Sequence, residues 1–135
     1  AAPAKWAGLL AEKTGATVLL KGAVSVVCGP EGDTFTQAEA PGWTATAGAG
    51  DALAGILGAV LAMEQAQAEA DGHSLSASET AAGAAAGTWV HSIAARLAAG
   101  LGAGPELGRK KKVGHPILAS DIVQQIPAAI ELALR

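Results

Sequence analysis

A single carboxylate stands at the start of an apolar run, directly after a loop of residues with almost no side chain. Residues 44–62 read TATAGAGDALAGILGAVLA, and the acid is Asp51. Gly48, Ala49 and Gly50 allow the backbone to approach a ligand closely. The first turn of a helix leaves amide N–H groups without partners at the positive end of the helix dipole. Together these features predict an anion site that suits a phosphate whose charge grows during transfer.

A structural interpretation of Asp51 stands beside this one, because an acid in the first turn of a helix is common and favourable in itself. Two observations favour the functional interpretation. A Gly-x-Gly sequence precedes the acid, and Thr44 and Thr46 place hydroxyls just upstream. The loop is not a Walker P-loop, because no Gly-Lys-Ser/Thr sequence follows it.

The elements that must position this loop follow an α/β order. Short β-rich runs predict strands within residues 16–22, 24–30 and 31–37. The spacing of apolar residues predicts helices over about residues 4–14, 50–63, 79–98 and 118–135, with a polar stretch over residues 64–79 and a loop over residues 100–117. We expect Gly15 to end the first helix and Ser76 or Ser78 to cap the third. Pro127 should interrupt or restart the last helix.

The composition excludes several classes of protein. A length of 135 residues allows one modest domain. A net charge of -3 gives no reason to expect a basic surface that binds nucleic acid. The lone Cys28 excludes an internal disulfide framework and a zinc site built on cysteines. The uncharged apolar run of residues 52–63 is far shorter than the ~20 residues of a membrane-spanning helix, and the first residues lack the core of a signal peptide. We therefore expect a soluble, cytoplasmic protein that binds neither nucleic acid nor a membrane.

Three stretches in one consistent order carry a family resemblance. They are VLLKGAVSVVCGPEGD at residues 18–33, ATAGAGDALAGILGAVLA at residues 45–62 and ILASDIVQQIPAAI at residues 117–130. Together they resemble the ADP/ATP-dependent NAD(P)H-hydrate dehydratase family of the ribokinase-like superfamily. The first resembles its strand–Lys-Gly–strand hairpin, the second its Gly-x-Gly-Asp anion hole, and the third its C-terminal helix. The resemblance runs from about Trp6 to Leu134.

The resemblance implies a three-layer α/β/α ribokinase-like fold, of which residues 1–135 are the C-terminal part of a single domain. The order of elements agrees, because three short strands followed by three helices do not make a self-sufficient sheet covered on both faces. The first helix also has no strand before it. We therefore expect the chain alone to bind phosphate or adenine nucleotide weakly and to lack turnover.

The resemblance also implies a role for each residue that matches the family's motifs. Asp51 contacts the substrate and acts as base toward the hydroxyl of hydrated NADH or NADPH. Phosphorylation of this hydroxyl by ADP or ATP makes it a leaving group, and elimination restores NAD(P)H. Mg²⁺ should arrive with the nucleotide. The implied anion hole consists of Ala47, Gly48, Ala49 and Gly50. The implied nucleotide-binding residues are Lys21, Gly22, Ala23, Val24, Ser25 and Gly50.

Two of these positions depart from the family's pattern. Ser25 stands where the family usually has Thr, and the hydroxyl is kept. Ala49 replaces a common Thr or Ser, which leaves only the backbone amide as a donor at that position. Without the resemblance, Lys21 at the end of a strand would be interpreted as a solvated lysine.

Other functions remain open on the same residues. Hydroxymethylpyrimidine kinases have a similar Lys-Gly strand but often carry Cys in place of the motif Asp, which is Asp51 here. Ribokinase-type sugar kinases usually follow the motif Asp with Ala-Phe, whereas this chain has Leu53 at the second of these positions. A third possibility is a non-catalytic interaction module, because Ala- and Gly-rich helices allow close contacts between subunits. We expect a homo-oligomer.

The remaining polar candidates are interpreted as structural. His91 lies among alanines and is expected to be a hydrogen-bonded packing residue, and no pair of histidines has metal-ligand spacing. The basic run of residues 109–112 is expected to be a solvated loop. Trp43, beside Pro41 and Gly42, is a candidate for lining the nucleotide cleft.

Overall fold

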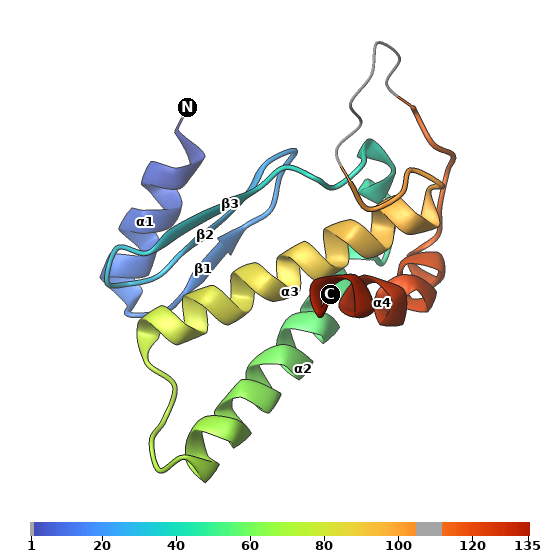
Figure 1. Cartoon of the computed structure of the whole chain (residues 1–135). Coiled ribbons are helices and arrows are strands. Elements are labelled where there is room, and N and C mark those ends of the chain that lie inside the picture. Colours follow the sequence, from blue (N-terminus) through green and yellow to red (C-terminus); the bar gives the residue numbers. More distant parts are fainter. Residues whose placement is uncertain (1, 105–111) are drawn as a thin grey trace. The chain divides into compact units, whose positions relative to one another are not determined.

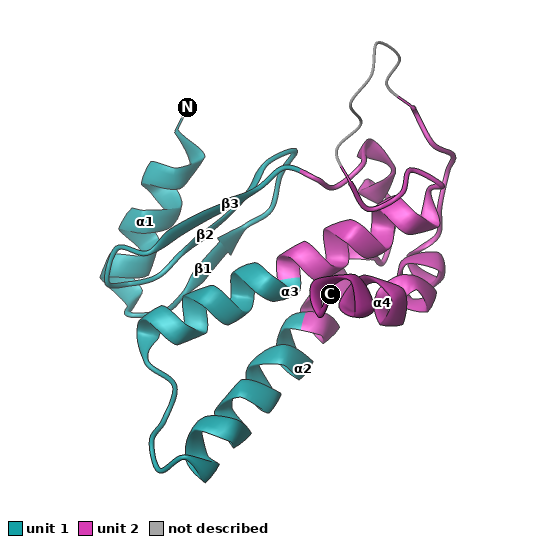
Figure 2. Cartoon of the chain, in the orientation of Figure 1, with its two compact units in different colours: residues 1–38, 57–87 teal, residues 39–56, 88–135 magenta. Residues whose placement is uncertain are grey.

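The computed structural model describes residues 2–104 and 112–135, which form a mixed α/β structure with one small sheet (Figure 1). Its elements are α1 (Pro3–Thr14), β1 (Val18–Leu20), β2 (Ser25–Cys28), β3 (Thr34–Gln37), the 3-10 turn η1 (Gly42–Thr44), α2 (Ala49–Ala70), α3 (Ala77–Ala98) and α4 (Ala119–Ala133). The chain divides into two compact units (Figure 2). Unit 1 holds residues 1–38 and 57–87, and unit 2 holds residues 39–56 and 88–135.

Unit 1 is built around an antiparallel sheet of order β1-β2-β3. Successive residues of a strand face opposite sides of the sheet, and β2 shows this alternation. Val26 and Cys28 pack against the small residues Ala7 and Ala11 of α1. Val27 packs on the other side, in a cluster that includes Ala81 of α3. Both faces of β2 are therefore covered within unit 1, whereas β3 is largely exposed.

The structure confirms the three strands and the end of the first helix. Gly15 has a φ of 69° and its N–H donates to the carbonyl of Ala11, which is the C-cap geometry expected there. Ser76 caps α3, as one of the two alternatives predicted, and the hydroxyl of Ser78 instead donates to Asp33. A mixed α/β fold is thus established, and the three-layer ribokinase-like fold stays a prediction.

The predicted end of the second helix at Met63 is wrong, because α2 continues through the polar stretch to Ala70. Glu, Gln and Ala are strong helix formers. Hydrogen bonds between side chains four residues apart also support the extension: Gln65 donates to Glu69, and Gln67 donates to Asp71. Polarity alone therefore marked the solvent-facing part of a helix and not its end.

The predicted interruption at Pro127 is also wrong, since α4 runs through it from Ala119 to Ala133. A proline inside a helix removes the hydrogen bond to the carbonyl four residues earlier, which here belongs to Val123. Val123 is half exposed, so water can satisfy that carbonyl.

Among the helices described, none is both long enough and apolar enough to cross a membrane.

Candidate functional site

The loop that precedes α2 lies in unit 2 and is held by its own short hydrogen bonds. The hydroxyl of Thr44 donates to the carbonyl of Pro41 at 2.8 Å, which closes the η1 turn. A second turn follows, in which the N–H of Ala49 donates to the carbonyl of Thr46 at 3.3 Å. Gly48 lies in this second turn with a φ of 85°, a conformation that favours glycine. Two successive hydrogen-bonded turns therefore lead the chain into α2.

Gly48 is required for space as well as for backbone conformation. A Cβ built on Gly48 would lie 3.1 Å from the Cβ of Ala119, at the start of α4. The first residues of the C-terminal helix thus lie directly against the loop within unit 2. The predicted motif at residues 117–130 and the predicted anion hole are in contact at this point.

Two further contacts fix the loop from the rest of unit 2. The indole Nε1 of Trp43 donates to the carbonyl of Val113 at 2.7 Å. The Nε2 of His91 on α3 lies 2.9 Å from the carbonyl oxygen of Ala49, and His91 is buried. His91 is therefore a buried, hydrogen-bonded residue, as predicted, but the sequence did not indicate that its partner is the loop.

Backbone donors remain open at the start of α2. The N–H of Ala52 is bonded to the carbonyl of Gly48 at 2.9 Å. Among the residues that the structure describes, none accepts a hydrogen bond from the amides of Gly48, Gly50 or Asp51. Unpaired first-turn amides at a helix N-terminus are suited to an anion. Ala49 differs from its neighbours, because it is buried and its own amide is engaged in the turn.

Asp51 does not behave like the other acids that start helices in this chain. Glu79 in α3 and Asp121 in α4 occupy the same third helical position, and each carboxylate accepts a hydrogen bond at 2.8 Å from the backbone N–H three residues earlier. These are capping interactions. The Asp51 carboxylate is exposed and forms no hydrogen bond with a described residue. Its structural interpretation as a helix cap therefore has no hydrogen bond to support it.

The other predicted site residues lie in unit 1, at the turn between β1 and β2. Lys21, Ala23 and Val24 are exposed, and Ser25 begins β2. A Cβ built on Gly22 would lie 3.2 Å from the carbonyl oxygen of Val24, so a tight turn is one reason for glycine here. This turn and the loop before α2 belong to different units.

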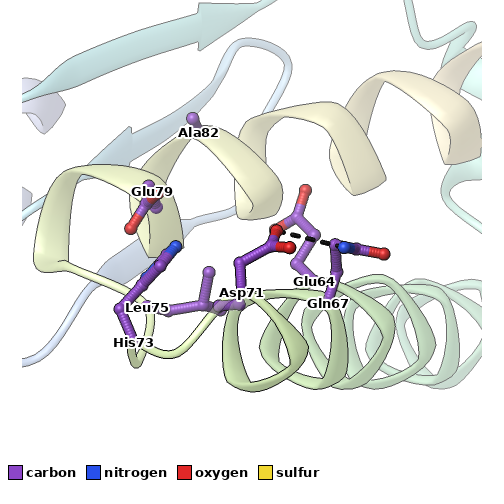
Figure 3. Close-up of a pocket in the computed structure, with 8 residues that line it drawn as sticks. Glu64, Gln67, Asp71, His73, Leu75, Glu79 and Ala82 are labelled. Atoms are coloured by element: carbon purple, nitrogen blue, oxygen red, sulfur yellow. Dashed lines mark hydrogen bonds between the residues drawn. The ribbon is translucent and has the colours of Figure 1, made fainter.

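A pocket of about 310 Å³ in unit 1 contains none of the predicted site residues. It lies between the end of α2 and the start of α3 (Figure 3). The carboxylates of Glu64, Asp71 and Glu79 line it together with His73, so it is unsuited to a phosphate. One oxygen of Glu64 is buried without a hydrogen-bond partner among the described residues. The pocket therefore adds nothing to the anion site.

The order of these features along the chain agrees with a known family. A sequence profile described as NAD(P)H-hydrate dehydratase matches residues 3–103, which include both the β1–β2 turn and the loop before α2. The chain belongs to this family.

Of the polar candidates outside the loop, His73 and His115 are exposed, and residues 109–111 of the basic run lie outside the described residues.

Curated relatives agree with this assignment. The bifunctional NAD(P)H-hydrate repair enzyme Nnr of Mycobacterium leprae is 49% identical over 61 residues, which is 45% of this chain and 13% of that protein. The enzyme of the same name from Mycobacterium tuberculosis (strain CDC 1551 / Oshkosh) is 51% identical over 53 residues, covering 39% of this chain and 11% of that protein. The matched region is thus a small part of these relatives. No solved structure matches the chain.

Proposed function

We propose that this chain supplies the phosphoryl-binding part of an ADP- or ATP-dependent NAD(P)H-hydrate dehydratase. One observation carries the proposal. Asp51 is an exposed carboxylate that caps nothing, and it stands beside the unpaired amides of Gly48 and Gly50. A base and a set of anion donors are what transfer of a phosphoryl group to a hydroxyl requires from a protein. The names of the relatives support hydrated NADH or NADPH as the substrate.

In the proposed mechanism each residue has one task. Asp51 accepts the proton of the substrate hydroxyl while that oxygen takes the terminal phosphoryl group of ADP or ATP. The amides of Gly48 and Gly50, with the backbone of Ala47 and Ala49 shaping the loop, stabilise the negative charge on the transferred group. The transfer leaves AMP from ADP or ADP from ATP. Cleavage of the carbon–oxygen bond then expels phosphate, the neighbouring ring carbon loses a proton, and the double bond of the dihydronicotinamide is restored. Mg²⁺ accompanies the phosphates of the nucleotide.

The turn between β1 and β2 is proposed to contact the nucleotide. Lys21 is exposed and carries the only charge in this turn, and Gly22 presents a backbone without a side chain. The hydroxyl of Ser25 can donate or accept a hydrogen bond. We assign Lys21–Ser25 this role by position in the family, with residues 1–135 as the C-terminal part of one three-layer ribokinase-like domain in a cytoplasmic enzyme.

Association with a second copy is part of the same proposal. Trp6 and Leu10 on α1 are 61% and 51% exposed. Large exposed apolar side chains on one element are typical of surfaces that another chain covers. A homo-oligomer that buries this face of α1 is therefore expected in solution.

The test compares two matched acids in the full-length protein. Asp51→Asn should leave the free energy of unfolding nearly unchanged and reduce ADP- or ATP-dependent recovery of NADH absorbance from the hydrate by ~10²–10⁴-fold, the usual effect of removing a general base. Asp121→Asn weakens a capping hydrogen bond instead, so it should lower stability and keep turnover.

Near-normal turnover by Asp51→Asn would return Asp51 to a structural role. A second outcome identifies a different reaction. If the wild-type protein consumes ATP and phosphorylates an added sugar or hydroxymethylpyrimidine without acting on the hydrate, it is a small-molecule kinase.

A further inference from the structure

His91 is a buried polar side chain in an alanine-rich stretch of α3, where an imidazole needs a specific reason. It is 6% exposed, and burial of an imidazole costs free energy unless its nitrogens are hydrogen-bonded. Its Nε2 lies 2.9 Å from the carbonyl oxygen of Ala49. A carbonyl can only accept a hydrogen bond, so this contact requires the proton on Nε2. His91 therefore donates to the first residue of α2.

The carbonyl of Ala49 shares a peptide group with the amide of Gly50. In a planar trans peptide the C=O and N–H point in opposite directions. A donor that holds the carbonyl oxygen therefore also fixes the direction of the Gly50 N–H. Hydrogen bonding at one end of a peptide polarises the group and strengthens the bond that its other end can form. The Gly50 amide is one of the unpaired donors at the start of α2.

We propose that His91 is a positioning residue of the phosphoryl site. It donates from Nε2 to the Ala49 carbonyl, and so aims and polarises the Gly50 N–H toward the phosphoryl group. The identity of that group rests on the function proposed above. The arrangement itself rests on unit 2, where His91 and the close contact between Gly48 and Ala119 hold the loop at two points.

The variants separate the hydrogen bond from the burial of a side chain. His91→Met keeps a side chain of similar size and has no donor. His91→Gln keeps an N–H at a similar reach. Ser92→Ala is the matched control: Ser92 is also buried on α3, and its hydroxyl donates to the carbonyl of Thr88 at 3.0 Å, within the same helix.

Two measurements on the full-length protein give the result. The first is hydrogen exchange, without ligand, of the two hydrogen-bonded amides of this segment, those of Ala49 and Ala52, and the second is affinity for inorganic phosphate and for ADP. His91→Met should speed exchange at these amides and weaken both affinities roughly five- to tenfold, the effect of one lost hydrogen bond. His91→Gln should recover much of the loss. Ser92→Ala should change neither measurement.

The inference is overturned if His91→Met matches Ser92→Ala in loop exchange and in phosphate affinity. It is also overturned if the wild-type protein binds neither phosphate nor ADP. A wild-type protein that binds both without acting on the hydrate would refute the proposed dehydratase activity alone, because exchange and phosphate affinity test His91 without reference to the reaction.

Discussion

Replacing Gly48 by alanine tests whether the loop before α2 and the start of α4 meet as the structure shows. Two costs are expected. The first is backbone strain, because a φ of 85° costs an L residue about 1–2 kcal/mol. The second is steric, because the new Cβ would lie 3.1 Å from the Cβ of Ala119, inside the 3.5–4.0 Å at which carbon atoms attract. Overpacking of this kind costs about 1–3 kcal/mol.

Gly72 provides a matched control for the strain. Its φ is 86°, and a Cβ built there meets nothing within 4 Å. An alanine also restricts the unfolded chain, which offsets about 0.4–1 kcal/mol of the strain at either position. Gly72→Ala should therefore lower the free energy of unfolding by about 1 kcal/mol, and Gly48→Ala by roughly 2–4 kcal/mol. Denaturant unfolding of the two variants measures the difference.

A double variant identifies the contact directly. Gly48→Ala combined with Ala119→Gly removes the close approach and keeps the backbone strain, so part of the lost stability should return. Because the strained loop also displaces the Gly50 amide, Gly48→Ala should weaken phosphate binding while Gly72→Ala leaves it unchanged. Equal destabilisation by Gly48→Ala and Gly72→Ala, with phosphate binding intact in both, would refute the reasoning.

Three further changes have definite expected outcomes. Gly22→Val should weaken nucleotide binding in calorimetric titration much more than it lowers stability, and equal losses would mean that Gly22 serves the turn alone. Gly114→Ala should lower the free energy of unfolding by roughly 2–4 kcal/mol, because φ is 70° and the new Cβ would lie 2.7 Å from the Ala99 carbonyl oxygen; a wild-type melting temperature would contradict this. The backbone and side-chain hydrogen bonds from Ser76 hold the pKa of Glu79 below its ordinary value of 4.5. The resulting stabilisation is present above that value and is lost as the pH falls through the lower folded-state pKa, so Glu79→Gln should flatten the stability curve in that acid range. An unchanged acid limb in the variant would show that the capping bonds do not act on stability.

Local sequence determined the elements of this chain and the form of its loop. Strand propensity and glycine punctuation predicted β1, β2 and β3, and the left-handed Gly15 ends α1 as its position indicated. These features depend on neighbours within a few residues, which the sequence displays directly. The errors at Met63 and Pro127 have the same local origin. At Met63 the polar composition was weaker than the helix propensity of Glu, Gln and Ala. At Pro127 one missing hydrogen bond, beside the half-exposed Val123, did not end the helix.

Tertiary structure alone decided what surrounds the loop. His91 is 42 residues from its partner Ala49, and Ala119 is still farther along the chain from Gly48. No periodicity encodes such pairs, because they form only when helices distant in the sequence pack together and bury the groups between them.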